Sequence, residues 1–187
     1  MDLSAERLDS VVSKKEIEAY IRNAGSADIT YFGGKYMGGI TIMQHPDEIA
    51  GVIYDILESG KKIHNYLEVG AAAGGTTFII NKYLQPDNIV LIDDNSNERC
   101  VFRADILKDV TYTEIIGHSH TEGTVDVLRS LNMTFDAVFV DANHTYEAVR
   151  GDIDIYGNFL NFHGLMIMHD TALSYLGAMK VVQEMKE

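Results

Sequence analysis

Short apolar runs alternate with amphipathic segments along the chain from about residue 46 onward. The runs "AVFV" and "LMIM" are nearly continuous in apolar residues, as in strands covered on both faces of a parallel sheet. Other segments space apolar residues three and four positions apart, which is typical of amphipathic helices. The predicted strands are Asn65–Val69, Asn88–Asp93, Thr111–Gly117, Phe135–Asp141 and Gly164–His169. The predicted helices are Lys14–Arg22, a helix from Pro46 to a stop at Gly60, Thr76–Leu84, Asn97–Lys108, Thr121–Leu131, Thr145–Leu160 and Ser174–Lys186.

The alternation of strands and helices predicts right-handed crossovers and a mostly parallel sheet. The expected fold class is α/β, with a Rossmann-like, doubly wound, mostly parallel sheet and helices on both of its faces. In sheets of this kind, ligands bind beyond the carboxyl ends of the strands. The residues that end each predicted strand are therefore the candidates for a functional site.

Composition and charge narrow the classes of protein and partner. The chain has 187 residues, 46% hydrophobic and 23% charged, which suits a soluble globular domain with its own core. Its formal net charge of -13 argues against non-specific binding to nucleic acid or to an anionic membrane. No segment approaches the roughly 18 apolar residues of a membrane span. The single cysteine, Cys100, cannot form a disulfide within the chain, and we expect a cytoplasmic protein in which it is a small buried residue.

The first predicted strand runs into a glycine-rich loop, "EVGAAAGGT", from Glu68 to Thr76. The dinucleotide fingerprint needs a second glycine, and Ala72 stands in its place. A carboxylate at the loop mouth would also repel a diphosphate and favour a cationic ligand such as S-adenosylmethionine. The alternative is a tight turn that binds nothing. The candidate donor-binding residues of this loop are Glu68, Gly70, Ala71, Gly74 and Thr76.

The ends of strands two and three supply further candidates. Asp93 lies about 20 residues beyond the glycine loop, where an acid can accept hydrogen bonds from both ribose hydroxyls. Asp94 is the neighbouring alternative, and a solvated acid or helix cap is the non-functional one. The third strand is followed by "GHSH", in which His118 or Ser119 would lie near the base of a bound nucleoside.

Strands four and five end in acids and histidines. Asp141 is followed three residues later by His144, and strand five ends in His169 and Asp170. If these strands are neighbours, the four side chains lie close together at the carboxyl edge of the sheet, where carboxylates and imidazoles can bind a divalent cation. Such a cation would lower the pKa of a substrate hydroxyl, and His144 could accept its proton as general base. Helix capping by Asp141 and His144 and a core role for His169 are the alternatives.

Two resemblances follow from these motifs. Glu-x-Gly-x-x-x-Gly after a first strand resembles motif I of the class I S-adenosylmethionine-dependent methyltransferases. The segments "GGITIMQHPDEIAGVI", "LEVGAAAGGTT", "VFVDANHTYEAVRGDI" and "GLMIMHD" resemble metal-dependent methyltransferases related to macrolide-sugar O-methyltransferases and to the protein named cephalosporin hydroxylase. This resemblance covers roughly Tyr31 to Thr171.

The resemblance implies roles for individual residues. It implies that Asp141 and Asp170 bind magnesium and that His144 is the base. His169 stands where the family often has an acid, which favours manganese if this imidazole is a ligand. The residue after the strand-three glycine, often an aspartate near adenine in related methyltransferases, is His118 here. Gln44 matches a family position near the donor, and we assign it only to the helix entry.

The expected organisation has two parts: an N-terminal helix and glycine-rich lid segment at residues 1–45, and a methyltransferase core at residues 46–187. The lid would be Tyr31–Gly39, for which a plain connector is the alternative. Class I methyltransferases finish their sheet with an antiparallel hairpin. The sequence given reaches Glu187 without one, so we expect a missing edge hairpin and a truncated core. The exposed strand would then allow pairing with another copy in a homo-oligomer.

The leading hypothesis is an S-adenosylmethionine-dependent O-methyltransferase. It would use magnesium or manganese and act on a small hydroxylated acceptor, a sugar being one candidate. The second hypothesis is a non-catalytic donor-binding or assembly module with the same fold. The third is a nucleotide-dependent oxidoreductase, which Ala72 and Glu68 disfavour.

Overall fold

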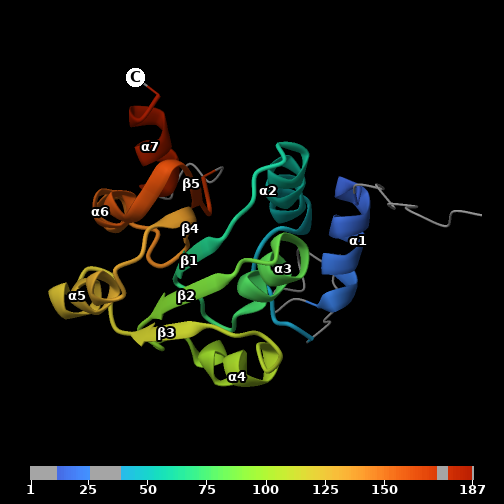
Figure 1. The fold of residues 1–187 in the computed structure, drawn as a ribbon, viewed down its shortest axis with the longest axis horizontal. Coiled ribbons are helices and arrows are strands. Elements are labelled where there is room, and N and C mark those ends of the chain that lie inside the picture. The colour runs from blue at the N-terminus through green and yellow to red at the C-terminus, as the bar shows by residue number, and fades with distance from the viewer. Residues whose placement is uncertain (1–11, 26–38, 172–176, 187) are drawn as a thin grey trace, which may run out of the picture.

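A computed structural model describes residues 12–25, 39–171 and 177–186 of the chain. Its centre is a five-stranded sheet in the order β3-β2-β1-β4-β5, and every neighbouring pair of strands is parallel (Figure 1). The predicted Rossmann-like sheet, with strands four and five side by side, is confirmed. The strands are β1 (Asn65–Val69), β2 (Asn88–Asp93), β3 (Thr113–Ile116), β4 (Phe135–Val140) and β5 (Leu160–Met168).

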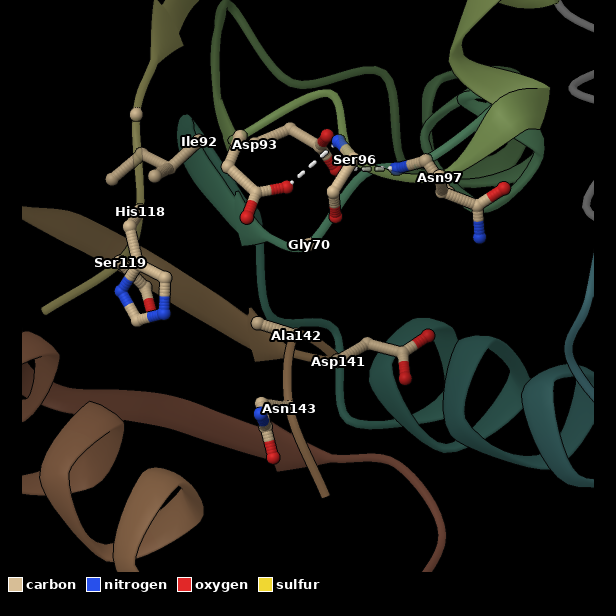
Figure 2. Close-up of a pocket in the computed structure, with 13 residues that line it drawn as sticks. Gly70, Ile92, Asp93, Ser96, Asn97, His118, Ser119, Asp141, Ala142 and Asn143 are labelled. Atoms are coloured by element: carbon tan, nitrogen blue, oxygen red, sulfur yellow. Dashed lines mark hydrogen bonds between the residues drawn. The ribbon is translucent and has the colours of Figure 1, made fainter. Parts of the chain in front are cut away.

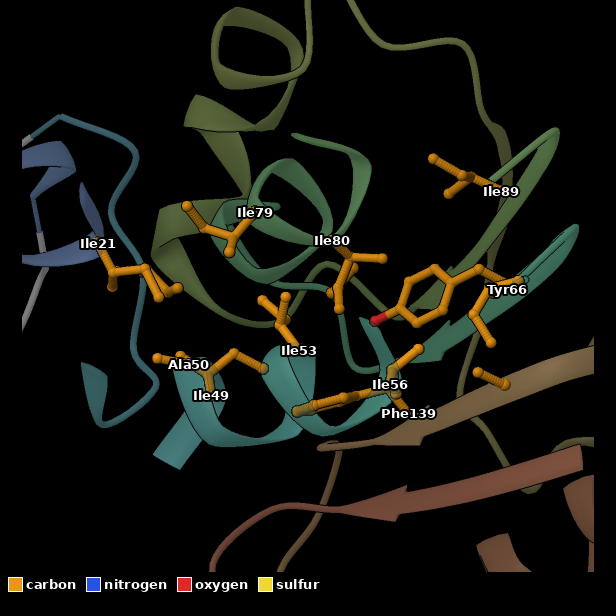
Figure 3. Packing of buried hydrophobic residues seen from close by; sticks show 14 of the residues in the cluster. Ile21, Ile49, Ala50, Ile53, Ile56, Tyr66, Ile79, Ile80, Ile89 and Phe139 are labelled. Carbon is orange, nitrogen blue, oxygen red and sulfur yellow. The ribbon is translucent and has the colours of Figure 1, made fainter. Parts of the chain in front are cut away.

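Helices cover both faces of the sheet because successive strand residues point to opposite sides. On one face, α2, α3 and α4 share a core with strand residues such as Tyr66 and Phe139, and α1 packs against α2 (Figure 3). On the other face, α5 and α6 cover the alternate positions, including Leu67 and Val138. The helices are α1 (Lys14–Ala24), α2 (Pro46–Glu58), α3 (Gly75–Leu84), α4 (Arg103–Ile106), α5 (Glu122–Ser130), α6 (Tyr146–Tyr156) and α7 (Gly177–Glu184), with 3-10 turns at Glu98–Phe102 and Gly157–Phe159.

The strand ends lie level with one another, which places the candidate residues in one row. The amide of Gly70 donates to the Ile92 carbonyl at 2.8 Å, and the amide of Asp141 donates to the Val69 carbonyl at 2.8 Å. The next strand continues the pattern, because the amide of His169 donates to the Val140 carbonyl at 3.1 Å. Backbone hydrogen bonding therefore extends one residue beyond the strands and fixes the floor of the site.

Several predicted boundaries are wrong. The helix predicted at Thr145–Leu160 ends at Tyr156, and β5 begins at Leu160, four residues before the predicted Gly164. The helix predicted at Asn97–Lys108 is a 3-10 turn followed by the short α4. Of the predicted final helix, the structure describes α7 from Gly177 onward.

The N-terminal part is only partly described. The helix predicted at Lys14–Arg22 is present as α1, whose Ser13 and Glu16 form a capping box, and it packs against α2. The predicted lid lies outside the described residues except for Gly39, and the division of the chain at residue 45 stays a prediction. In the described part of the chain, no helix has both the length and the apolar character needed to cross a bilayer.

Candidate functional site

The carboxyl ends of β1 to β4 border a cavity of about 320 Å³ (Figure 2). Figure 2 shows His118 and Ser119 at one end of this cavity and Asn97 at the other, with Asp93 between them. We call it the donor cavity, after the ligand that the sequence predicts. The predicted site residues that line it are Gly70, Asp93, Asp94, His118, Ser119 and Asp141.

The glycine loop is shaped by contact with the backbone of β4. Gly70 has a φ of +91°, and a Cβ atom there would lie 2.4 Å from the Asp141 carbonyl oxygen and 2.7 Å from the Ala142 Cα. Only glycine fits both this dihedral angle and this close approach. Of the other predicted loop residues, Ala71 and Thr76 line a second cavity. Gly74 is the N-cap of α3, packs against Leu107 and lines neither cavity, so its predicted contact with the donor stays a prediction.

Glu68 does not face the ligand side, which corrects the prediction that it binds the donor. Glu68 is 1% exposed and lies on the face of the sheet that α2 and α3 cover. It accepts hydrogen bonds from the Tyr66 hydroxyl at 2.9 Å and the Thr77 hydroxyl at 2.7 Å. Burial raises the pKa of Glu68 to about 8, against the opposing effect of these two hydrogen bonds. Glu68 therefore links β1 to α3 through its hydrogen bond with Thr77.

This buried acid gives a pH-dependent prediction for stability. Because the pKa is raised from about 4.5 to about 8 on folding, the folded protein holds a proton that the unfolded chain releases between these values. The wild type should therefore lose stability as pH rises through this window. Glu68→Gln mimics the protonated acid, so it should match the wild type near pH 5 and exceed it at pH 8 by on the order of a few kcal/mol. Thermal unfolding across this range measures the difference, and parallel pH profiles would contradict it.

Asp93 and Asp94 both line the donor cavity but differ in their surroundings. Asp93 is 8% exposed. Its carboxylate accepts from the Ala72 amide at 2.8 Å and the Asn95 amide at 2.7 Å, and it lies 3.2 Å from Arg103. Asp94 is exposed and accepts from the Ser96 amide. Asp93 is thus the better-fixed acid, and it also holds the glycine loop in place.

Cys100 belongs to this same corner of the site and is not the buried apolar residue that the sequence led us to expect. It is half-buried, and its Sγ lies 3.4 Å from Asp93 Oδ1 and 3.2 Å from an Arg103 nitrogen. Burial, followed by the Asp93 charge, raises the pKa of the Cys100 thiol. The thiol is therefore a neutral neighbour of the Asp93 carboxylate.

A second cavity of about 210 Å³ adjoins the donor cavity and carries the acids and histidines of strands four and five. We call it the Asp–His cavity. Its other wall comes from the segment before α2, including Thr41, Met43 and Gln44. The two cavities share Gly70, Ala72, Asn97, Asp141 and Ala142.

The four predicted side chains do meet in the Asp–His cavity. Asp141 Oδ1 lies 3.0 Å from His144 Nε2 and 2.9 Å from His169 Nδ1. Asp170 Oδ2 lies 3.1 Å from His144 Nδ1, on the far side of that ring. Ligand atoms of Asp141, His144 and His169 fall within 4.8 Å of one another. The compact group thus contains His144, whereas the predicted metal set was Asp141, His169 and Asp170.

The electrostatics of this group favour charged histidines. Hydrogen bonding to Asp141 raises the pKa of His144 above its ordinary value, and burial only partly opposes this. Burial would lower the pKa of His169, but Asp141 and Asp170 reverse the effect and raise it. Burial would raise the pKa of Asp141, but the hydrogen bond from His144 and the proximity of His169 hold it below its ordinary value. Two carboxylates beside two histidines that favour the protonated form leave the cavity close to neutral, so a metal ion that binds here must displace protons from the imidazoles.

Two residues near the site were missed by the sequence reasoning. Gln44 is 3% exposed, and its amide donates to Asp141 Oδ2 at 2.6 Å, so its role extends beyond the helix entry. Asp152 on α6 is fully buried, with its Oδ1 2.9 Å from His120 Nε2 behind the donor cavity. No spacing rule connects Gln44 with Asp141. For Asp152, the sequence did offer a signal: this acid lies on the apolar face of a predicted helix.

Comparisons with known proteins agree with this geometry. A family model described as a methyltransferase domain matches residues 67–171. A protein assigned as a caffeoyl-CoA O-methyltransferase from Staphylococcus aureus has a similar structure, with a TM-score of 0.54 and 17% identity over 66% of this chain and 57% of its own. The O-methyltransferase TomG from Streptomyces achromogenes gives a TM-score of 0.56 and 17% identity over 88% and 69% of the two chains.

A third similar structure is the MycE methyltransferase of mycinamycin biosynthesis, determined with Mg, SAH and mycinamycin VI. It gives a TM-score of 0.55 and 15% identity over 72% of this chain and 36% of its own. The chain thus spans 57% and 36% of the Staphylococcus protein and MycE. No curated protein sequence gives a significant match.

Identities this low show a shared fold, whereas the family model also matches the sequence itself. It covers more than half of the chain, from β1 through the end of β5. The protein therefore belongs to the methyltransferase-domain family, with the Rossmann-like sheet of a class I methyltransferase.

Proposed function

We propose that this protein transfers a methyl group from S-adenosylmethionine to a hydroxyl of a small molecule, a sugar being one candidate, with the help of a divalent cation. The observation that carries the proposal is the continuity of the two cavities. The donor cavity and the Asp–His cavity share the backbone of Gly70 and the residue Asp141. A donor on one side and an acceptor hydroxyl on the other would meet at this junction, as an in-line transfer requires.

The donor cavity suits a nucleoside without phosphates. Its middle carries Asp93 and Asp94, whose carboxylates can accept hydrogen bonds from ribose hydroxyls. Among the similar structures, TomG is a complex with SAM and MycE is a complex with SAH. Family membership, together with Ala72 in place of the second glycine of the dinucleotide fingerprint, disfavours the oxidoreductase hypothesis.

The donor set of the Asp–His cavity fits a divalent cation. His169 Nδ1 is buried and, among the residues described, has no hydrogen-bond partner of good geometry, although Asp141 Oδ1 is 2.9 Å away. An orphaned imidazole nitrogen beside carboxylates is a ready ligand atom. Asp141 and His169 would hold the cation, with Asp170 or His144 beside them. Mixed imidazole and carboxylate ligands suit manganese better than magnesium. When bound, the cation would lower the pKa of the acceptor hydroxyl and orient it.

His144 is the proposed base, and its surroundings set a condition on that role. With carboxylates near both ring nitrogens, the raised pKa of His144 favours the protonated ring, which cannot accept another proton. The ring can work as a base only where the charge of Asp141 and Asp170 is offset. Gln44 helps to keep Asp141 in place through its hydrogen bond to Oδ2.

Donor binding tests the proposal and separates the two candidate acids. Calorimetry should show that the chain binds S-adenosylhomocysteine at least about tenfold more tightly than NAD. Asp93→Asn should weaken this binding roughly tenfold to a hundredfold, because a charge-assisted hydrogen bond to ribose becomes a neutral one. Asp94→Asn is the matched control and should bind nearly as the wild type does. Tighter binding of NAD would overturn the proposal, and a loss confined to Asp94→Asn would move the ribose site to that residue.

A further inference from the structure

Gln44 is a buried polar side chain that reaches the Asp–His cavity from the connection before α2. It is 3% exposed and lines the cavity. Its side-chain amide donates to Asp141 Oδ2 at 2.6 Å, across 97 positions of the chain. Removing a buried donor of this kind is costly, because the acceptor loses its partner without gaining water. Gln44 is therefore placed to control how Asp141 can be used.

The backbone that carries Gln44 is anchored on both sides. Before it, the Ile42 amide donates to the Gly25 carbonyl at 3.4 Å, and Ile42 is fully buried. The start of α3 packs closely on the same segment, because a Cβ atom on Gly75 would lie 2.7 Å from the Ile42 Cα. After it, Pro46 begins α2. The side-chain amide thus extends toward the cavity from a fixed position.

The two carboxylate oxygens of Asp141 have separate partners. Oδ1 lies 3.0 Å from His144 Nε2 and 2.9 Å from His169 Nδ1, whereas Oδ2 accepts from Gln44. A cation bound by Asp141 and an imidazole would take the place of a proton beside Oδ1. The amide of Gln44 is uncharged, so it occupies Oδ2 without repelling a cation, as a lysine or an arginine would. Asp141 is therefore left with one oxygen to offer.

Resting on the proposed function, we infer that Gln44 is a positioning residue that makes the site select manganese over calcium. Calcium takes roughly six to eight oxygen ligands and commonly binds both oxygens of one carboxylate. Manganese prefers octahedral geometry, which the narrow bite of a two-oxygen carboxylate distorts. By holding Oδ2, Gln44 keeps Asp141 from the two-oxygen mode that suits calcium. His169 favours manganese too, so the share of Gln44 is the change that follows its substitution.

The test measures the dissociation constants of manganese and calcium by calorimetry on the full chain at one fixed pH. The wild type should bind manganese at least about tenfold more tightly than calcium. Gln44→Met keeps the length of the side chain but cannot donate, so Asp141 Oδ2 becomes free. Manganese affinity should fall roughly tenfold, as is typical when a hydrogen-bond partner of a metal ligand is removed. Calcium affinity should stay or rise, so the ratio of the two affinities should fall at least about tenfold.

Two further variants complete the design. Gln183→Met changes an exposed glutamine on α7 in the same way and should leave both affinities unchanged. Gln44→Glu has nearly the shape of the wild-type side chain and keeps the test decisive if Gln44→Met does not fold. An ionised carboxylate cannot donate to Asp141 and adds an oxygen beside it, so the ratio should fall at least as far.

The outcomes separate the inference from the proposed function. An unchanged ratio in a folded Gln44→Met, or in Gln44→Glu, overturns the inference and leaves the proposed function in place. A merely structural role for Gln44 would weaken both cations equally, which also leaves the ratio unchanged and counts against selection. If the wild type binds S-adenosylhomocysteine but neither cation, the metal part of the proposed function fails, and the inference fails with it.

Discussion

Asp141→Ala is expected to abolish manganese binding and to reduce methyl transfer by at least about a thousandfold, because cation catalysis is worth several kcal/mol of transition-state stabilisation. Asp141 is the carboxylate that contacts both His144 and His169, so its loss leaves two imidazoles without the charge that gathers them. Affinity for S-adenosylhomocysteine should change little, because Asp93 and Ser119 are untouched. Titration with manganese, calorimetry with S-adenosylhomocysteine and a methyl-transfer assay measure the three effects.

Companion experiments locate the role of each partner. Chelation of the wild type should reproduce the Asp141→Ala result, and excess magnesium should not rescue the variant. Asp126→Ala removes an exposed acid that pairs with Arg129 and should leave all three measurements unchanged. A wild-type chain that binds S-adenosylhomocysteine but no manganese at saturation would count against the metal mechanism and favour a non-catalytic module.

The role of His144 is decided by the same measurements. If His144 is the base, His144→Ala should keep manganese and S-adenosylhomocysteine binding and lose roughly 10²–10⁴ in rate. Loss of manganese binding instead would make His144 a ligand, in agreement with the compact group of Asp141, His144 and His169.

Gly70→Val is expected to reduce affinity for S-adenosylhomocysteine by more than about a hundredfold, because the cost of a non-glycine φ and of a steric clash add to several kcal/mol. The obstacle is the Asp141 carbonyl, 2.4 Å from the new Cβ, and not the ligand itself. That carbonyl belongs to the residue directly after β4, whose amide is bonded to β1, and cannot move aside as a flexible side chain would. The loop must therefore lift away from β4, and calorimetry and thermal unfolding would record the loss of binding and of stability.

Gly60→Ala is the matched control for Gly70→Val. Gly60 also has a positive φ, +68°, but a Cβ atom there would meet nothing within 4 Å. This control should lose only about 1 kcal/mol of stability, the cost of the dihedral angle, and keep its ligand affinity. If Gly70→Val binds S-adenosylhomocysteine as tightly as Gly60→Ala does, the loop is not held in the way described.

The sequence predicted the sheet well because buried strands leave a clear apolar signal. The bounds of β1 and β2 match the prediction, since a glycine-rich loop ends β1 and a pair of acids ends β2. The region after α6 was misjudged because Tyr156 and Leu160 continue the helical spacing although they serve different elements. Tyr156 is buried under the sheet, whereas Leu160 already pairs with Phe135 in β5. The early part of β5 also carries polar residues and an exposed Phe162, as an edge strand can, so it lacked the apolar signal.

The candidate site was predictable where it depends on strand ends and unpredictable where it depends on packing. Asp141, His144, His169 and Asp170 follow directly from two neighbouring strands. Glu68 was misplaced because its type was considered without its face, although alternation puts it on the same side as Tyr66 and opposite Leu67. Gln44 reaches Asp141 from 97 positions away, a distance over which local patterns carry no information.

The contact between Gly70 and the Asp141 backbone fixes the distance between the donor cavity and the Asp–His cavity. Asp93 (the proposed ribose acid), the glycine loop and Asp141 are joined by backbone hydrogen bonds across adjacent strands, so their spacing stays constant when side chains elsewhere change. Thr41 and Met43, in contrast, belong to the connection before α2 and form the opposite wall of the Asp–His cavity. Substitutions in this connection can reshape the room for an acceptor while the spacing of the reacting groups stays constant. If the proposed function holds, variants in this short segment should change which acceptors react without changing donor affinity.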